Sequence, residues 1–363
     1  MKAAILHQAP GDLVIEDVEL DSPGPDEVLI RVVASGLCHS DLHFMEGKLP
    51  WPLPAALGHE AAAVVEAVGA HVSEFRAGDH VVSCLSQFCG ACRECSAART
   101  WLCENRRGLG QADRPRPRMT LRGKPVNPLA GLGAFAERML VHRNAIVSVP
   151  RELPLDRAAL LGCAVVTGVG SVVNGARVEP GSSVAVIGCG GIGLNVVQGA
   201  ALAGAERIIA IDLQKKKLEL ARVFGATDVI DASSGDPVAQ VQELMKGGVD
   251  YAFEAIGLAK TAEQAFAMIR PGRTAYLVGV PPLGALIQLP GTLMLMQAKG
   301  LQGLFMGSNR FKRDIPMLAS LYLRGKLKLD ELIAERITLD EVNAGYAKMR
   351  TGEQARSVIM FDA

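Results

Sequence analysis

The stretch SVAVIGCGGIG, residues 183–193, decides the fold of the second half of this chain. It begins as a near-continuous apolar strand and ends in a G-x-G-x-x-G turn at Gly188, Gly190 and Gly193, from which an apolar helix follows. Asp212 closes the next predicted strand, about 20 residues further along. Strand, glycine turn, helix and acidic residue in this order form the βαβ fingerprint of a dinucleotide-binding unit.

Each part of this fingerprint has a physical role. The glycines, Gly191 included, let the backbone approach a pyrophosphate, and the helix amino terminus offers it free N–H groups and partial positive charge. Asp212 accepts hydrogen bonds from the hydroxyls of the adenosine ribose and repels a 2′-phosphate, which favours NAD over NADP. Lysines follow directly at 215–217, so NADP stays an alternative, because cations beside the ribose can accommodate a phosphate. Cys189 inside the turn is interpreted as a small side chain only.

The pattern around the fingerprint divides the chain into two parts. Up to about residue 165, short apolar runs such as EVLIRVVASG alternate with Gly, Pro and Asp turns, which predicts a β-rich domain. From about residue 180, apolar strands alternate with helical stretches, which predicts a doubly wound parallel sheet. The fold class is therefore α/β with two domains, since 363 residues exceed the size of one core. Near the end, Thr338 and Glu341 predict a capping box that opens a helix, and RSVIMF predicts a last strand.

One stretch departs from this pattern. Residues 106–129 are rich in proline and arginine and show no sustained period, which predicts a long surface loop. Such a loop is either functional, often at an interface, or a solvated insertion.

Composition narrows the classes of partner. The chain has 38 Lys and Arg residues against 38 Asp and Glu residues, which argues against nucleic-acid and anionic-membrane partners and favours a small molecule. The first twenty residues lack the apolar core of a signal peptide, and we expect no uncharged apolar run of the roughly 18 residues that a membrane span needs. A cytoplasmic protein with reduced thiols is the expectation.

Four cysteines lie within fifteen residues, in the spacing C-x2-C-x2-C-x7-C. Four thiolates at this spacing can close a tetrahedron on zinc, which predicts a structural zinc site. The alternatives are disulfides, which need an oxidising compartment, an iron–sulfur cluster, and unpaired core cysteines. The four predicted ligands are Cys89, Cys92, Cys95 and Cys103.

A second set of potential ligands is spread far along the chain. The segment GLCHSDLHFMEG contains Cys38, GHE contains His59, and LLGCAVVTG contains Cys163. Two thiolates and one imidazole leave a fourth coordination position open for water or substrate, as a catalytic zinc requires. Each of these residues alone is more often structural than functional.

These motifs together resemble the zinc-dependent medium-chain alcohol dehydrogenase family. The likeness runs along the whole chain, with GHE, the cysteine cluster, GCAVVTG and GCGGIG in the same order. It implies a GroES-like catalytic domain at 1–164 and 307–363, a Rossmann NAD-binding domain at 165–306, and two zinc ions per subunit. The catalytic zinc would lie on Cys38, His59 and Cys163.

The resemblance also implies roles for individual residues. Glu60 matches an acidic residue behind the catalytic zinc, and Asp41 matches a carboxylate that orients His59. Zinc lowers the pKa of the alcohol, Ser40 takes its proton, and the proton passes through the nicotinamide ribose to His43. His43 capping its own loop is the alternative. The other positions that match cofactor-binding residues are His39, Thr167, Lys217, Val280 and Arg356.

Two differences from family members lead to hypotheses about cofactor binding and about the oligomeric state. Many relatives have an arginine against the pyrophosphate where this chain has His39, so NADH binding is expected to weaken as pH rises through the titration of this histidine. Tetrameric bacterial relatives tend to shorten the loop after Cys103, which is long here, so a homodimer is expected rather than a tetramer.

Residues that match the family's substrate pocket are apolar, which favours a medium-sized or aromatic primary alcohol as substrate. The enzyme would interconvert such alcohols with the corresponding aldehydes or ketones. The alternative is a mycothiol- or glutathione-dependent formaldehyde dehydrogenase. A non-catalytic relative with a structural or regulatory role is disfavoured, because the zinc ligands, Ser40 and His43 are all present. The pocket residues are Leu49, Trp51, Leu85 and Phe135.

Overall fold

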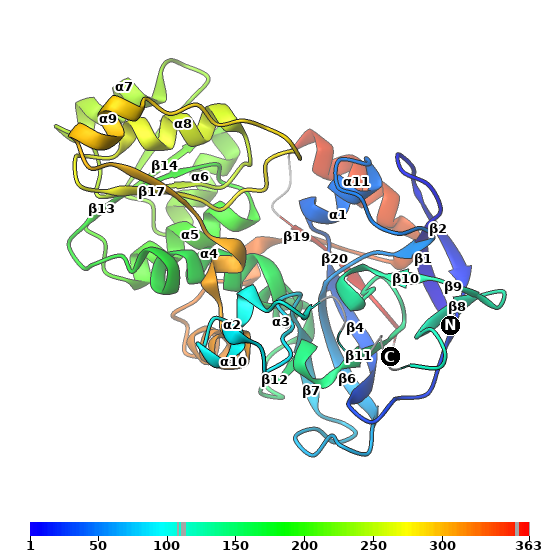
Figure 1. Ribbon diagram of the computed structural model, residues 1–363. Helices are drawn as coiled ribbons and strands as arrows, with labels where there is room; N and C mark the ends of the chain where they lie inside the picture. The colour runs from blue at the N-terminus through cyan, green and yellow to red at the C-terminus, as the bar shows by residue number, and fades with distance from the viewer. Residues whose placement is uncertain (107–108, 110–113, 353–355, 363) are drawn as a thin grey trace. The chain divides into compact units, whose positions relative to one another are not determined.

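The computed structural model describes residues 1–106, 109, 114–352 and 356–362 (Figure 1). The chain divides into two compact units: Met1–Cys163 with Arg310–Ala363, and Ala164–Asn309. The first unit is built from both ends of the chain, and the second is inserted between them.

The main sheet of the first unit has the strand order β12-β7-β6-β4-β20-β19, and β11 also pairs with β4. β20, the last strand of the chain, lies antiparallel to β4 and parallel to β19. The C-terminal strand thus completes a sheet that begins within the first forty residues. The strands are β4 (Glu27–Gly36), β6 (Glu60–Val68), β7 (His80–Ser83), β11 (Arg138–His142), β12 (Ile146–Ser148), β19 (Ile333–Ile337) and β20 (Arg356–Met360).

Two smaller sheets and several helices complete the first unit. The sheets have the orders β10-β5-β1-β2 and β3-β8-β9. Their strands are β1 (Lys2–Leu6), β2 (Leu13–Asp17), β3 (Glu19–Leu20), β5 (Ala55–Ala56), β8 (Met119–Leu121), β9 (Lys124–Pro125) and β10 (Asn127–Pro128). The helices are α1 (His39–Met45), α2 (Arg93–Ser96), α3 (Leu155–Leu160), α10 (Phe311–Leu323) and α11 (Val342–Thr351). The predicted capping box is confirmed, since Thr338 N and Oγ1 lie 2.8 and 3.0 Å from Glu341 Oε2 ahead of α11.

The second unit contains the predicted parallel sheet, with the order β15-β14-β13-β16-β17-β18. All residues of β13 are buried, as a strand covered on both faces requires. The strand order reverses between β13 and β16, so the crevice of this doubly wound sheet opens there. The strands are β13 (Ser183–Ile187), β14 (Arg207–Asp212), β15 (Asp228–Asp231), β16 (Tyr251–Glu254), β17 (Thr274–Leu277) and β18 (Gly300–Gly303), and the helices are α4 (Val166–Gly170), α5 (Gly191–Leu202), α6 (Lys215–Val223), α7 (Pro237–Leu244), α8 (Ala259–Met268) and α9 (Gly291–Met296).

One helical stretch corrects an expectation drawn from the sequence. Leu155–Ala176 is continuous over 22 residues, with a mean hydropathy of 1.7, and is long and apolar enough to cross a membrane. Thr167 and Ser171 interrupt the apolar residues, so the stretch was not recognised as one apolar run, yet its mean hydropathy remains high. Of its most apolar window, 83% is buried inside the protein, which is also typical of the core helix of a globular fold.

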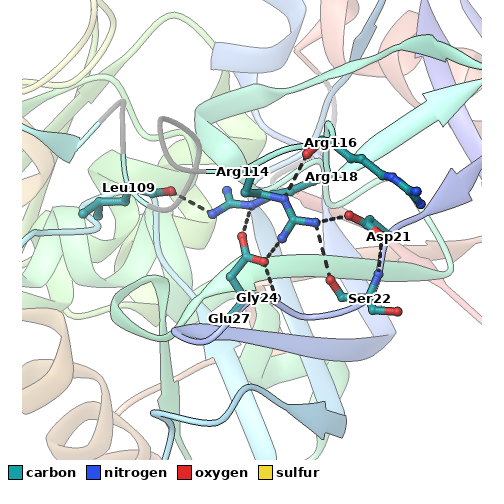
Figure 2. Close-up of polar contacts among 8 residues, drawn as sticks. All are labelled: Asp21, Ser22, Gly24, Glu27, Leu109, Arg114, Arg116 and Arg118. Atoms are coloured by element: carbon teal, nitrogen blue, oxygen red, sulfur yellow. Dashed lines mark hydrogen bonds and ion pairs between the residues drawn. The ribbon is translucent and has the colours of Figure 1, made fainter.

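The arginine-rich stretch 106–129 is more ordered than predicted where the structure describes it. Residues 119–128 contain β8, β9 and β10, and only 106, 109 and 114–118 belong to the described part before them. Figure 2 shows how this part is held. Arg118 donates to Glu27 at 2.6 Å and to the carbonyl of Leu109 at 2.7 Å, while Arg114 contacts the same carboxylate and donates to Asp21 at 2.6 Å.

Candidate active site and metal centres

Four buried side chains of the first unit bring potential ligand atoms together. One atom each of Cys38, His59, Glu60 and Cys163 lies within 4.8 Å of the other three. Sheet register explains part of this assembly, because Gly36 at the end of β4 pairs with Glu60 at the start of β6. Cys38, which precedes α1, and His59 therefore meet at one corner of the sheet, and Cys163 reaches them from the helical segment after α3.

A carboxylate orients the histidine of this cluster. Asp41 is fully buried on α1, and its Oδ2 lies 3.1 Å from Nδ1 of His59. Its other oxygen accepts a hydrogen bond from the backbone N–H of Gly58 at 2.9 Å. Burial alone would lower the pKa of His59, but the charges of Asp41 and Cys38 raise that pKa well above its usual value. Because Nδ1 faces Asp41, Nε2 is the ring nitrogen that can serve as a metal ligand, once the imidazole has given up its extra proton.

The two thiols share one negative charge. A hydrogen bond from Cys163 holds the pKa of Cys38 well below its usual range, against the opposing effect of burial, and the charges of Arg356 and His59 add to this. The same hydrogen bond and burial raise the pKa of Cys163. These shifts favour ionisation of Cys38 over Cys163, and the thiolate is the form that binds metal.

Glu60 lies beside the cluster in a space that only glycine leaves open. A Cβ atom on Gly36 would lie 2.4 Å from its Oε2. Burial raises the pKa of Glu60 to about 8, although the positive charge of Arg356 opposes this rise. The guanidinium lies 3.2 Å from Oε1 of Glu60 and donates to the carbonyl of Leu37 at 2.6 Å.

The donor set fits zinc. Among the described residues, neither oxygen of Glu60 and neither ring nitrogen of His59 has a well-aligned hydrogen bond, although all are buried. Nδ1 of His59 and Oε1 of Glu60 still face the charged groups of Asp41 and Arg356, so Nε2 of His59 and Oε2 of Glu60 are the atoms that a cation would satisfy. Two sulfur ligands with one imidazole are a zinc set that leaves a position for substrate.

The second cluster also assembles as its spacing predicts. Ligand atoms of the four lobe cysteines lie within 4.8 Å of one another. The Sγ atoms of Cys89 and Cys95 are 3.9 Å apart, and those of Cys92 and Cys103 are 4.0 Å apart. These separations are about twice an S–S bond, and all eight cysteines, each in a described segment, are free thiols. The disulfide alternative is therefore not observed.

Backbone amides favour the thiolate form of Cys89 in this lobe, whereas burial raises the pKa of Cys95 and Cys103. The N–H of Cys89 points to Sγ of Cys103 at 3.2 Å, and the N–H of Cys92 points to Sγ of Cys89 at 3.4 Å. Burial works against ionisation of Cys89, yet such amide donors lower its pKa to about 6. The lobe fits a closed four-sulfur zinc site.

Ser40 and His43 lie on α1, one turn apart and on the same face, and both are partly exposed. No hydrogen bond joins their side chains among the described contacts. Burial and the charge of Lys48 lower the pKa of His43, so its neutral form prevails at neutral pH.

In the second unit the fingerprint has the expected geometry. Gly188 has a φ of +94°, and a Cβ on Gly193 would lie 1.7 Å from the Gly188 carbonyl oxygen, so a side chain fits at neither position. Gly190 and Gly191 open α5. Asp212 ends β14, and its carboxylate accepts the N–H of Cys189 at 2.8 Å. The predicted acidic residue and the glycine turn are therefore directly connected.

The other predicted cofactor residues lie in both units. In the second unit, Thr167 is buried on α4, Lys217 is partly exposed on α6, and Val280 is exposed after β17. In the first unit, His39 is exposed, whereas Arg356 is buried against Glu60. Their roles in cofactor binding stay predictions.

The predicted pocket residues belong to different surroundings within the first unit. Phe135 is fully buried and packs edge-on against Tyr346 at 6.2 Å between ring centroids. Trp51 packs against Phe44 at 6.1 Å. Leu49 and Leu85 are partly exposed. A shared substrate pocket stays a prediction.

Sequence reasoning missed Ser83, which supports the ligand segment. Its hydroxyl donates to the His59 carbonyl at 3.3 Å and accepts the N–H of Ala61 at 3.1 Å. No local motif marks Ser83, because its contact arises from the pairing of β7 with β6.

Comparisons with known proteins agree with this geometry. Residues 24–151 match the model of the alcohol dehydrogenase GroES-like domain, and residues 191–320 match that of the zinc-binding dehydrogenases. An alcohol dehydrogenase class-3 from Pisum sativum is 37% identical over 99% of this chain and 97% of its own.

Solved structures are similar over the whole chain. An alcohol dehydrogenase zinc-binding domain protein from Burkholderia ambifaria has a TM-score of 0.95 at 34% identity, covering 100% of this chain and 99% of its own. A benzyl alcohol dehydrogenase from Acinetobacter calcoaceticus has a TM-score of 0.94 at 33% identity, covering 99% of each chain. The chain therefore belongs to the zinc-dependent medium-chain alcohol dehydrogenase family and is an oxidoreductase.

Proposed function

We propose that this protein interconverts primary, medium-sized or aromatic alcohols and their aldehydes by hydride transfer to NAD. The observation that carries this proposal is the buried cluster of Cys38, His59, Glu60 and Cys163, in a chain that also holds a complete dinucleotide fingerprint. In this proposal the catalytic domain spans 1–164 and 307–363, and the NAD-binding domain spans 165–306.

Two bound groups would supply the central chemistry. Zinc on Cys38, His59 and Cys163 would act as a Lewis acid toward the substrate oxygen, and NAD would accept the hydride. A second zinc on the four lobe cysteines would be structural, because all its positions are filled by protein.

The chain's own residues then provide orientation and proton transfer. Asp41 faces the His59 ring at 3.1 Å, and the Arg356 guanidinium lies 3.2 Å from Oε1 of Glu60, where its charge opposes protonation of that carboxyl. The hydroxyl of Ser40 accepts the alcohol proton while its own proton moves on toward neutral His43 and solvent. The alcohol thus loses a proton to solvent and a hydride to the cofactor, which balances a two-electron oxidation.

The proposed assembly is a cytoplasmic homodimer. The free state of the cysteines supports a reducing compartment. An interface is supported by large apolar side chains near α9 that are 78 to 83% exposed, which is unusual for a monomer surface. They are Leu283, Leu286, Leu295 and Met296.

A substrate panel tests the proposal. Zinc-replete protein is assayed with benzyl alcohol, ethanol and their aldehydes against NAD and NADP, and with formaldehyde plus glutathione or mycothiol. We expect NAD-dependent oxidation of benzyl alcohol that needs no thiol. Activity only with a formaldehyde–thiol adduct would support the formaldehyde dehydrogenase alternative, and a wild type inactive with every pair would contradict the proposed function.

A further inference from the structure

Glu254 closes the turn that joins β16 to α8 in the second unit. It is the last residue of β16, and its side chain is fully buried. One carboxylate oxygen accepts three hydrogen bonds: from the N–H of Ile256 at 2.9 Å, the N–H of Gly257 at 2.8 Å and the hydroxyl of Thr261 at 2.8 Å. One oxygen therefore fixes both the turn and the start of α8.

The backbone of Glu254 ties a second segment to this turn. Its carbonyl accepts the N–H groups of Val278 at 2.9 Å and Gly279 at 3.0 Å, directly after β17. The turn after β16 and the segment after β17 approach each other most closely at their glycines. A Cβ on Gly279 would lie 2.2 Å from the nitrogen of Gly257, and a Cβ on Gly257 would lie 2.4 Å from the carbonyl oxygen of Val280. We call Glu254, Gly257, Thr261 and Gly279 the Glu254 lock.

The lock presents two apolar side chains beside the fingerprint. Ile256 lies against the first glycine of the turn, since a Cβ on Gly188 would be 2.5 Å from its Cγ1. Val280 directly follows the lock. Both remain accessible, at 47% and 43% exposure. They lie at the carboxyl ends of parallel strands, where doubly wound sheets bind dinucleotides.

We propose that Glu254 is a positioning residue for the dinucleotide. Through the lock it fixes Ile256 and Val280 as a preformed apolar wall, although its own side chain is fully buried. Without the carboxylate, the turn loses three hydrogen bonds and samples other conformations. The free energy needed to order the turn then reduces the free energy of ligand binding. This inference rests on the proposed use of NAD.

The same strand offers a matched control. Asp250, just before β16, is also a buried carboxylate, and it accepts the N–H and the hydroxyl of Ser183 at 2.9 and 2.8 Å. It lies at the opposite, amino edge of the sheet. A variant at Asp250 therefore loses comparable stability but leaves the wall intact.

The experiment measures NADH affinity by fluorescence titration and thermal unfolding without cofactor, on full-length, zinc-replete protein. We expect Glu254→Ala to weaken NADH binding at least tenfold and to raise KM for NAD more than it lowers kcat. Glu254→Gln, which keeps an acceptor oxygen, should recover affinity to within about threefold. Asp250→Ala should lower the melting temperature while changing NADH affinity less than twofold. If Glu254→Ala does not fold, Thr261→Val removes one of the three bonds and should weaken binding two- to threefold.

Equal NADH affinity in wild type and Glu254→Ala, or equal weakening by Glu254→Ala and Asp250→Ala, would overturn the role of the lock. A wild type that binds no NADH would refute the proposed function, and the inference with it. Tight binding by wild type with an unaffected variant refutes the lock alone.

Discussion

Arg118 donates from Nε to Oε1 of Glu27 at 2.6 Å, and the two side chains are only 2% and 3% exposed. Arg114 contacts the other oxygen of the same carboxylate. Replacing Glu27 by alanine would leave a buried guanidinium without its counter-charge. We expect a loss of about 3–5 kcal/mol in the free energy of unfolding, measured by urea denaturation.

The control for this prediction is Glu66→Ala, which removes the half-exposed partner of Arg138 at 2.8 Å. Such a pair contributes about 0–1 kcal/mol. Equal losses in the two variants would contradict the importance of burial for the Glu27 pair.

Asp41→Asn tests how the metal ligand is oriented. The variant keeps the size of the side chain but removes the charge that faces Nδ1 of His59. Loss of such a partner typically lowers metal affinity or activity about 10- to 100-fold. Zinc competition with a chelator should show weaker binding at one site only, together with a lower kcat. An unchanged zinc affinity and kcat would show that Asp41 does not act on the ligand.

Cys92→Ser should remove the lobe zinc and lower stability before it lowers turnover, because metal binding stabilises the folded lobe. Zinc content per subunit, the melting temperature and kcat per catalytic site measure this. Cys84→Ser is the control, since Cys84 is a buried cysteine outside both clusters. A variant of normal stability that is inactive would argue against a purely structural lobe.

The pKa of His43, lowered by burial and by Lys48, predicts the acid side of the pH profile. In the proposed proton transfer, alcohol oxidation needs the neutral imidazole, so we expect kcat to fall only when pH drops below this lowered pKa. Lys48→Gln removes a cation and raises the pKa, which moves the acid limb toward higher pH. His43→Gln should abolish the limb and lower kcat. Identical profiles in all three proteins would exclude His43 from proton transfer.

The exposed apolar side chains near α9 predict the surface on which two subunits meet. Light scattering should give a dimer for the wild type, and Leu295→Glu should shift it toward monomer. Val14→Glu, at a half-exposed position of the other unit, should leave the dimer intact. A wild-type tetramer would contradict the predicted assembly.

Local patterns predicted the elements whose partners lie close in sequence. The turn from β13 to α5 and the cysteine lobe follow from short spacings, and both are present. Pairing between distant segments was not accessible in this way. Residues 119–128 were predicted as a loop because β8 and β10 pair with β3 and β5, which lie far upstream and supply hydrogen bonds that no local pattern shows. The short hairpin of β8 and β9 is local, and it was missed because it spans only a few residues.

The same limit applies to the candidate site. Cys38, His59 and Cys163 were assigned through the family resemblance, since their proximity depends on the register that pairs Gly36 with Glu60. Glu254 gave no signal, because its role comes from donors in a turn and from two glycines in close approach. Residues that act through the backbone of others are the hardest to find in a single sequence.

The two cysteine-containing clusters differ in how much of the chain they need. All four cysteines of the lobe are available once residue 103 has left the ribosome. The proposed structural zinc could therefore bind while most of the protein is still being made. The other cluster must wait for Cys163, and its neighbour Glu60 meets Arg356 only when the final strand is synthesised. In the proposed assembly, the residues of the structural metal site would thus be present early, whereas the surroundings of the catalytic cluster are completed only with the last strand.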